Sequence, residues 1–207
     1  MSTMRTHRRA TAGFTLVEMM VVIIIMAVML AWALPAYKNL VTQYRMSDEL
    51  NQIQTDVELA RSSAIRTGST VTICPTLAPA STAATPACSG NNEWNTGWIV
   101  FSDNNNDQTV DPGDAMLHVH IGIPGGDTLV SEVDGSGTAV STITFNQMGG
   151  TTAWGGTAAA PKQGQMVLND SNNDASMLRC LTISEAGMIQ VTSPQTEATV
   201  PAPPACT

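Results

Sequence analysis

The stretch that decides the fold is FTLVEMMVVIIIMAVMLAWAL, residues 14–34, in which Glu18 is the one charged side chain. A helix of this length spans about 30 Å, the thickness of the hydrocarbon core of a bilayer. The residues before it include Arg5, Arg8 and Arg9 and no acid, a pattern that favours keeping this end in the cytoplasm. The sequence therefore predicts one membrane-spanning helix, with the rest of the chain on the outer side.

Two simpler interpretations of this stretch are a cleaved secretory signal and a plain anchor. A secretory signal has a shorter apolar core followed by a small-residue cleavage site, whereas here Gly13 precedes the apolar run. A plain anchor leaves Glu18 unexplained, because a carboxylate inside a membrane costs about 3 kcal/mol. Glu18 is therefore a candidate functional residue.

The residues Gly13-Phe14-Thr15-Leu16-Val17-Glu18 resemble the processing site of type IV prepilins and pseudopilins. The resemblance implies that residues 1–13 are a leader peptide. It also implies that prepilin peptidase cuts between Gly13 and Phe14 and that Phe14 is then N-methylated. In such fibres the acid at the position of Glu18 pairs with the amine of a neighbouring subunit's first residue. We expect Glu18 to set the register of assembly.

The apolar run is expected to form the first part of one long helix, from residue 14 to about residue 67, with Gly68 as its cap. Residues 14–35 form the membrane or fibre-core half, and Pro35 is expected to kink the helix or remove a hydrogen bond. Residues 36–67 form an amphipathic half. Its apolar stripe comprises Met46, Leu50, Ile53, Val57, Ala60 and Ala64. The polar residues off this stripe are Asp48, Glu49, Gln52 and Asp56.

Residues 68–207 are expected to form a β domain outside the membrane, because short β-branched runs alternate with polar, glycine-rich loops. The predicted strands are 70–74, 98–102, 116–121, 142–145, 165–168, 177–183 and 188–192. We predict an α+β fold in which two small antiparallel sheets pack on the helix stripe, an arrangement that resembles the type IV pilin fold.

The four cysteines all lie on the predicted outer side, where an even number favours disulfides and three pairings are possible. Cys74–Cys88 is preferred for its proximity in sequence, which leaves Cys180–Cys206 to fasten the proline-rich tail. A zinc site is the alternative, although the chain has no Cys-x-x-Cys pair.

A metal site is conceivable in two further places. Asp103, Asn105, Asp107 and Asp114 occupy positions 1, 3, 5 and 12 of a calcium-type loop, but Gln108 replaces its turn glycine. A hairpin loop between two strands explains this segment better. His118 and His120 share one face of a predicted strand and could chelate a transition metal. With no third ligand nearby, an exposed strand face is the preferred interpretation.

Two further segments, residues 59–74 and residues 179–187, resemble the GspH/FimT family of minor pilins and pseudopilins. The FimT branch of the family includes proteins that bind DNA through a Gly-Arg-x-Arg motif. In this chain Gly187 is followed by Met188, Ile189 and Gln190. After residue 67 the chain has 2 basic residues and 12 acids, so DNA binding by this subunit is not favoured.

The resemblance implies a minor pilin that takes part in assembly or priming of a type IV pilus. The alternatives are a minor pseudopilin of a type II secretion system and a pilus-tip subunit for DNA uptake. The implied partners are other minor and major pilins, prepilin peptidase and the inner-membrane assembly platform. The chain is expected first in the inner membrane, with its C-terminal domain in the periplasm, and then in the fibre.

Composition is consistent with a structural role. The chain is 13% charged and has a net charge of −8, which excludes a highly charged disordered chain and disfavours nucleic-acid binding through bulk charge. Without residues 1–13 it would have 6 basic residues and 17 acids, a net charge of −11. No nucleophile motif, phosphate loop or paired-carboxylate site stands out, so we expect no enzyme activity and no cofactor.

Overall fold

The computed structural model describes residues 13–77, 86–133, 138–154, 163–174 and 176–192. The chain divides into two compact units, one that ends at Val41 and one that begins at Thr42. Residues 1–12 of the predicted leader and the whole of the proline-rich tail lie outside the described residues.

A single long helix, α1 (Leu16–Thr67), contributes to both units, as the sequence pattern predicts. Its start is capped by Thr15, whose hydroxyl accepts a hydrogen bond of 3.2 Å from the backbone N–H of Glu18. Its end is capped by Gly68, which adopts a φ of +68° and donates its N–H to the carbonyl of Ala64 at 3.0 Å. The expected cap at Gly68 is confirmed.

Within the first unit, every described residue from Gly13 to Val41 is exposed. This portion of α1 is long and apolar enough to cross a membrane. The helix continues through Pro35, which has no N–H to donate to the carbonyl one turn earlier.

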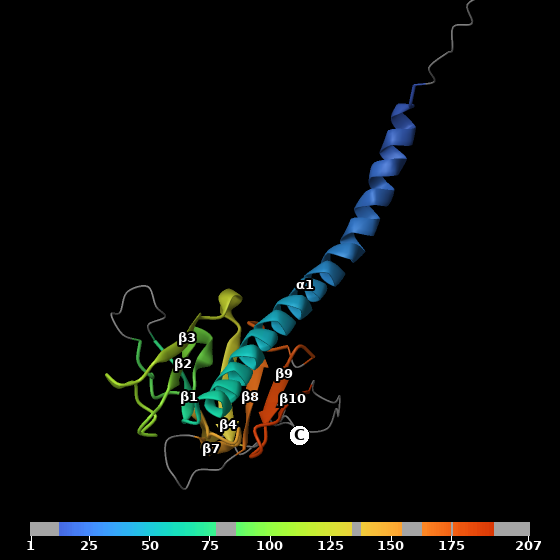
Figure 1. Ribbon diagram of the computed structural model, residues 1–207. Coiled ribbons are helices and arrows are strands. Elements are labelled where there is room, and N and C mark those ends of the chain that lie inside the picture. The colour runs from blue at the N-terminus through green and yellow to red at the C-terminus, as the bar shows by residue number, and fades with distance from the viewer. Residues whose placement is uncertain (1–12, 78–85, 134–137, 155–162, 175, 193–207) are drawn as a thin grey trace, which may run out of the picture. The chain divides into compact units, whose positions relative to one another are not determined.

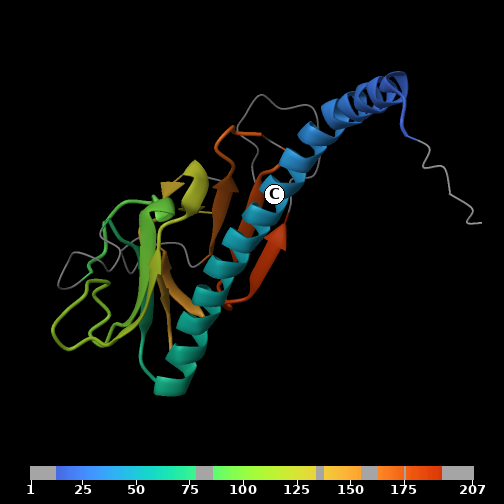
Figure 2. The same cartoon turned by 90° about the horizontal axis from the view of Figure 1, so that it is seen from above.

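The second unit contains two five-stranded antiparallel sheets, with the last turns of α1 lying across the strands (Figures 1 and 2). The first sheet has the order β3-β2-β1-β6-β7 and the second β10-β9-β8-β4-β5. The strands of the first sheet are β1 (Val71–Pro75), β2 (Gly97–Ser102), β3 (Met116–Ile121), β6 (Ile143–Phe145) and β7 (Thr151–Trp154). Those of the second are β4 (Thr128–Val133), β5 (Thr138–Ala139), β8 (Gly164–Asn169), β9 (Arg179–Ile183) and β10 (Ile189–Thr192). Two short 3₁₀ helices, η1 (Trp94–Thr96) and η2 (Pro124–Gly126), lie between strands.

The core lies between the helix and both sheets. All six residues of the predicted helix stripe are at most 4% exposed. They belong to one apolar cluster that also includes Ile73 and Val100 of the first sheet and Leu168 and Leu181 of the second. The predicted α+β fold, with two small antiparallel sheets on a helix stripe, is confirmed.

Three strands were not expected from the sequence. The strands β4, β5 and β7 lie in segments for which the sequence pattern predicts no strand. Four predicted strands start too early, by one residue in 70–74, 142–145 and 188–192 and by two residues in 177–183. Met177 belongs to a turn in which its N–H bonds to the carbonyl of Asp174 at 2.9 Å, and the turn that ends in Gly187, with a φ of +72°, precedes β10.

Cysteine pairing agrees with the preferred connectivity where it is described. Cys74 of β1 and Cys88 form a disulfide with their Cα atoms 5.5 Å apart. Cys180 is also disulfide-bonded, and Cys206, its predicted partner, lies outside the described residues.

Candidate functional site

The predicted processing bond lies just before the first turn of α1. Gly13 and Phe14 are both exposed, and Phe14 has 77% of its surface accessible. A methyl group built on Gly13 would contact nothing within 4 Å. The space around residue 13 in this chain therefore does not require a glycine there.

Glu18 lies in the first turn of α1, three residues after the capping Thr15. Acidic residues in a first helical turn interact favourably with the helix dipole. The exposed Glu18 follows Phe14, the first residue after the predicted processing bond, by four positions in the sequence.

The apolar side chains of this portion of α1 cover its whole circumference. Each large hydrophobic side chain between residues 14 and 41 is at least 44% exposed. An exposed apolar surface of this size requires lipid or other protein to cover it. The helix is suited to a membrane and equally suited to a bundle of similar helices.

The second unit contains two buried acids that the sequence pattern had placed off the apolar stripe. Glu49 is 2% exposed and Asp56 is 6% exposed, so the expectation that they lie outside the buried face is wrong. Because α1 packs on two sheets at once, the buried arc of the helix is wider than one stripe. A helical pattern alone does not reveal this width, so the burial of Glu49 and Asp56 could not be predicted from it.

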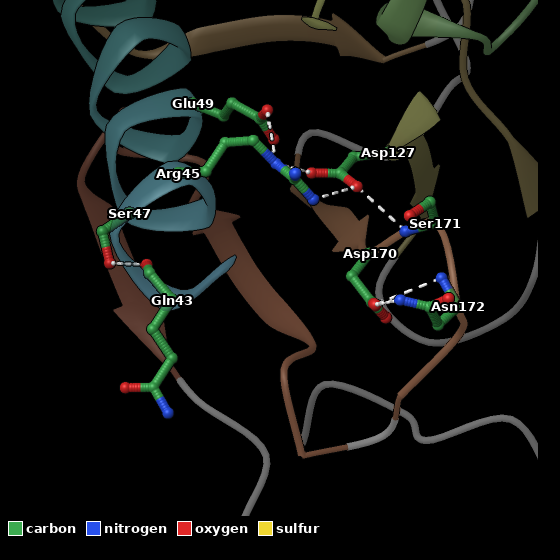
Figure 3. Close-up of polar contacts among 8 residues, drawn as sticks. All are labelled: Gln43, Arg45, Ser47, Glu49, Asp127, Asp170, Ser171 and Asn172. Atoms are coloured by element: carbon green, nitrogen blue, oxygen red, sulfur yellow. Dashed lines mark hydrogen bonds and ion pairs between the residues drawn. The ribbon is translucent and has the colours of Figure 1, made fainter. Parts of the chain in front are cut away.

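Glu49 shares one cation with a second buried acid (Figure 3). The guanidinium of Arg45 donates two hydrogen bonds of 2.8 Å to Asp127, which precedes β4, and its Nε lies 3.7 Å from Glu49. Asp127 also accepts the backbone N–H of Ser171 at 2.9 Å. A Cβ at Gly125, where φ is +93°, would lie 3.2 Å from the guanidinium carbon, so the glycine gives Arg45 room. Together these contacts connect α1 to both β4 and the β8–β9 turn.

The Glu49 carboxyl accepts no hydrogen bond among the described residues. Burial raises its pKa to about 8, and the negative charge of Asp127 acts in the same direction, while Arg45 partly offsets both. At neutral pH the neutral form of Glu49 is therefore favoured, and Arg45 serves mainly as the partner of Asp127.

Asp56 accepts a hydrogen bond of 2.8 Å from the indole Nε1 of Trp98, and its other oxygen lies 3.6 Å from Nε2 of His118. His120 stacks on the Trp98 ring at a centroid distance of 3.9 Å, and burial lowers the pKa of its imidazole. Its Nε2 is 2.8 Å from Oε1 of Gln52. The histidine face of β3 therefore contacts α1, and the preferred interpretation of an exposed strand face is wrong for His120.

The acidic loop between β2 and β3 is a hairpin connection, as the preferred interpretation predicts. Asp103 is fully buried and accepts hydrogen bonds from the hydroxyl of Thr72 and from two backbone N–H groups of the loop. Asp114 likewise accepts two backbone N–H groups. Hydrogen bonds from Thr109 lower the pKa of Asp107. These carboxylates brace the turn, and within the described ranges no three His, Cys, Asp or Glu residues gather around a possible metal position.

Comparison with known proteins gives two family matches. The sequence model of the type II transport protein GspH matches residues 49–187, and the prokaryotic N-terminal methylation motif matches residues 8–34. No curated protein matches the sequence. Two crystal structures of the type IV minor pilin FimU from Pseudomonas aeruginosa PAO1 are similar to this chain. They share 19% and 20% identity, with TM-scores of 0.46 and 0.45, and the matches cover 71% of this chain and 85% and 90% of FimU.

Proposed function

This chain belongs to the family of the type II transport protein GspH and carries the N-terminal methylation motif, and we propose that it is a minor pilin of a type IV pilus. Its role is assembly rather than catalysis. The observation that carries the proposal is the exposed apolar portion of α1 directly after an N-terminal methylation motif, with Glu18 in its first turn. Such a helix is suited to moving from lipid into a fibre core where neighbouring helices cover it.

In this proposal prepilin peptidase removes residues 1–13 and Phe14 is methylated. Glu18 then attracts the amine of a neighbouring subunit's first residue, which compensates a charge that is costly in an apolar environment. The second unit stays outside the membrane and contacts other minor and major pilins. Before assembly the chain waits in the inner membrane, where the assembly platform extracts it.

The proposal is tested by returning the full chain to a strain that lacks it and measuring its amount in sheared fibres. We expect Glu18→Gln to reduce the fibre-bound amount by about tenfold without changing the membrane-bound amount, because the attraction between the carboxylate and the neighbouring amine is lost. The matched control is Glu58→Gln, which removes an exposed acid elsewhere on α1. Fibre incorporation of the Glu18 variant at the wild-type level would contradict the role of this carboxylate.

A minor pseudopilin of a type II secretion system is the second candidate, because the family model that matches this chain is that of the type II transport protein GspH. Twitching motility and protein secretion of the deletion strain separate the two functions. Loss of twitching with normal secretion supports the pilus, and the reverse supports the secretion system. DNA binding is not proposed, because Gly187 is followed by Met188 and by no arginine up to the end of β10.

A further inference from the structure

Three exposed apolar side chains lie on neighbouring elements of the second unit. Ile65 of the last turns of α1, Met148 and Met188 are 52%, 82% and 66% exposed. Arg61 and Arg66 stand on the same end of α1 as Ile65. We call these five residues the methionine patch.

The close approach of three segments holds the patch together. A Cβ built on Gly149 would lie 2.7 Å from Cδ1 of Ile65, and one on Gly187 would lie 2.0 Å from the carbonyl oxygen of Gly149. The Nε of Arg61 donates a hydrogen bond of 3.0 Å to that same oxygen. Two glycines with positive φ thus let the turns that carry Met148 and Met188 contact each other and the helix. Met148 and Met188 therefore lie on turns that are packed against each other and against α1.

The charge around the patch differs from that of the rest of the domain. Among the described residues after Val41 the cations are Arg45, Arg61, Arg66 and Arg179, and Arg45 is engaged with Asp127. Of the remaining three, Arg61 bonds to Gly149 next to Met148, Arg66 follows Ile65 in the last turn of α1, and Glu185 is the acid in the turn that ends in Gly187. The chain after residue 67 has 2 basic residues against 12 acids. The patch therefore combines apolar side chains with positive charge on an acidic domain.

We propose that the methionine patch docks an apolar, carboxylate-bearing segment of a different subunit of the same fibre. Flexible methionines adapt to a partner surface, and flanking arginines select an acidic one. A second copy of this chain is a poor occupant, because a two-fold contact would bring both arginine pairs together and the net charge of −8 opposes self-association. The inference rests on the proposed function, because it takes the partner to be another pilin.

The test places a photoreactive amino acid at Met148 or Met188 of the full chain in cells that assemble the fibre. After illumination, adducts are identified by mass spectrometry in both the sheared-fibre and membrane fractions. We expect an adduct to an Asp- or Glu-containing peptide of a protein that has its own N-terminal methylation motif. The same reagent at Ile121, a 71% exposed side chain on β3, is expected to give about tenfold less of this adduct.

Substitutions of Arg66 test whether positive charge is needed for docking, because this side chain is exposed at the end of α1 and can be replaced without disturbing the core. Arg66→Glu is expected to reduce the adduct about tenfold, whereas Arg66→Lys keeps it. Adducts only to this chain itself, to lipid or to proteins without the motif would overturn the inference, as would no adduct at either methionine. Absence of the chain from fibres would contradict the proposed function. The adducts formed in the membrane fraction would still test whether the methionine patch binds another subunit.

Discussion

Arg45 of α1 and Asp127 before β4, 82 residues apart in sequence, are joined by two hydrogen bonds of 2.8 Å. The Asp127 side chain is fully buried and that of Arg45 is 31% exposed. The pair therefore connects the helix to the second sheet at a point where the Asp127 carboxylate is buried.

Arg45→Met is expected to destabilise the second unit by about 3–5 kcal/mol, because it leaves the buried Asp127 carboxylate without its cation. Arg66→Met is the matched control, since Arg66 is exposed, and its effect should stay within about 0.5 kcal/mol. Chemical denaturation of the full chain in detergent micelles measures both. Equal effects of the two substitutions would show that the Arg45–Asp127 pair contributes nothing specific.

The free energy of unfolding is expected to depend on pH through Glu49. The folded chain holds the Glu49 proton up to a pKa of about 8, whereas an unfolded glutamate loses it near pH 4.5. Between these values the folded state binds more protons than the unfolded state, so this contribution to stability falls as the pH rises from about 4.5 to about 8.

His120 acts in the opposite direction, because its lowered pKa makes stability rise as the pH increases through 6.5. The difference between the wild type and Glu49→Gln therefore isolates the Glu49 effect. We expect the variant to be progressively more stable than the wild type towards pH 8. A pH-independent difference would contradict the assignment.

The contribution of the Trp98–Asp56 hydrogen bond to stability can be measured by comparing Trp98 with a second buried tryptophan, Trp154. Trp98→Phe leaves the Asp56 carboxylate without its indole donor, whereas the indole N–H of Trp154 has no hydrogen-bond partner among the described residues. Both substitutions remove similar volume. Trp98→Phe should therefore cost about 1–3 kcal/mol more than Trp154→Phe, measured as unfolding free energies. A smaller loss for Trp98→Phe would refute the contribution of this bond.

The Cys74–Cys88 disulfide closes a short loop with a sequence separation of 14 residues. Replacing both cysteines by serine is expected to cost about 3 kcal/mol, because the unfolded chain regains the freedom of that loop. Thermal unfolding of the double variant and the wild type, without reductant, measures the difference. An unchanged midpoint would mean that the native chain gains nothing from this cross-link.

Much of the fold follows from local pattern. The spacing of Met46, Leu50, Ile53 and Val57 predicts the buried stripe, and the strongly β-branched runs predict seven strands. The strand β4, TLVSEV, was missed because polar residues interrupt its short apolar run, and β7 because its residues read as part of a polar loop.

The polar contacts of α1 could not be predicted in the same way. Glu49 and Asp56 each precede a stripe residue, Leu50 and Val57, so a one-sided helix would place them at the solvent edge. Their burial depends on a second sheet and on partners that are distant in sequence, Trp98 and Asp127. The processing site, by contrast, is a contiguous motif of six residues, 13–18, and could be recognised from sequence alone.

The central claim is that this chain is a processed subunit of an extracellular fibre. The most direct test is the intact mass of the chain recovered from sheared fibres, together with sequencing of its N-terminal peptide. The account predicts a chain that begins at Phe14 with a methylated amine and has lost residues 1–13. A chain that retains its first 13 residues, and that occurs in membranes but never in fibres, would contradict it.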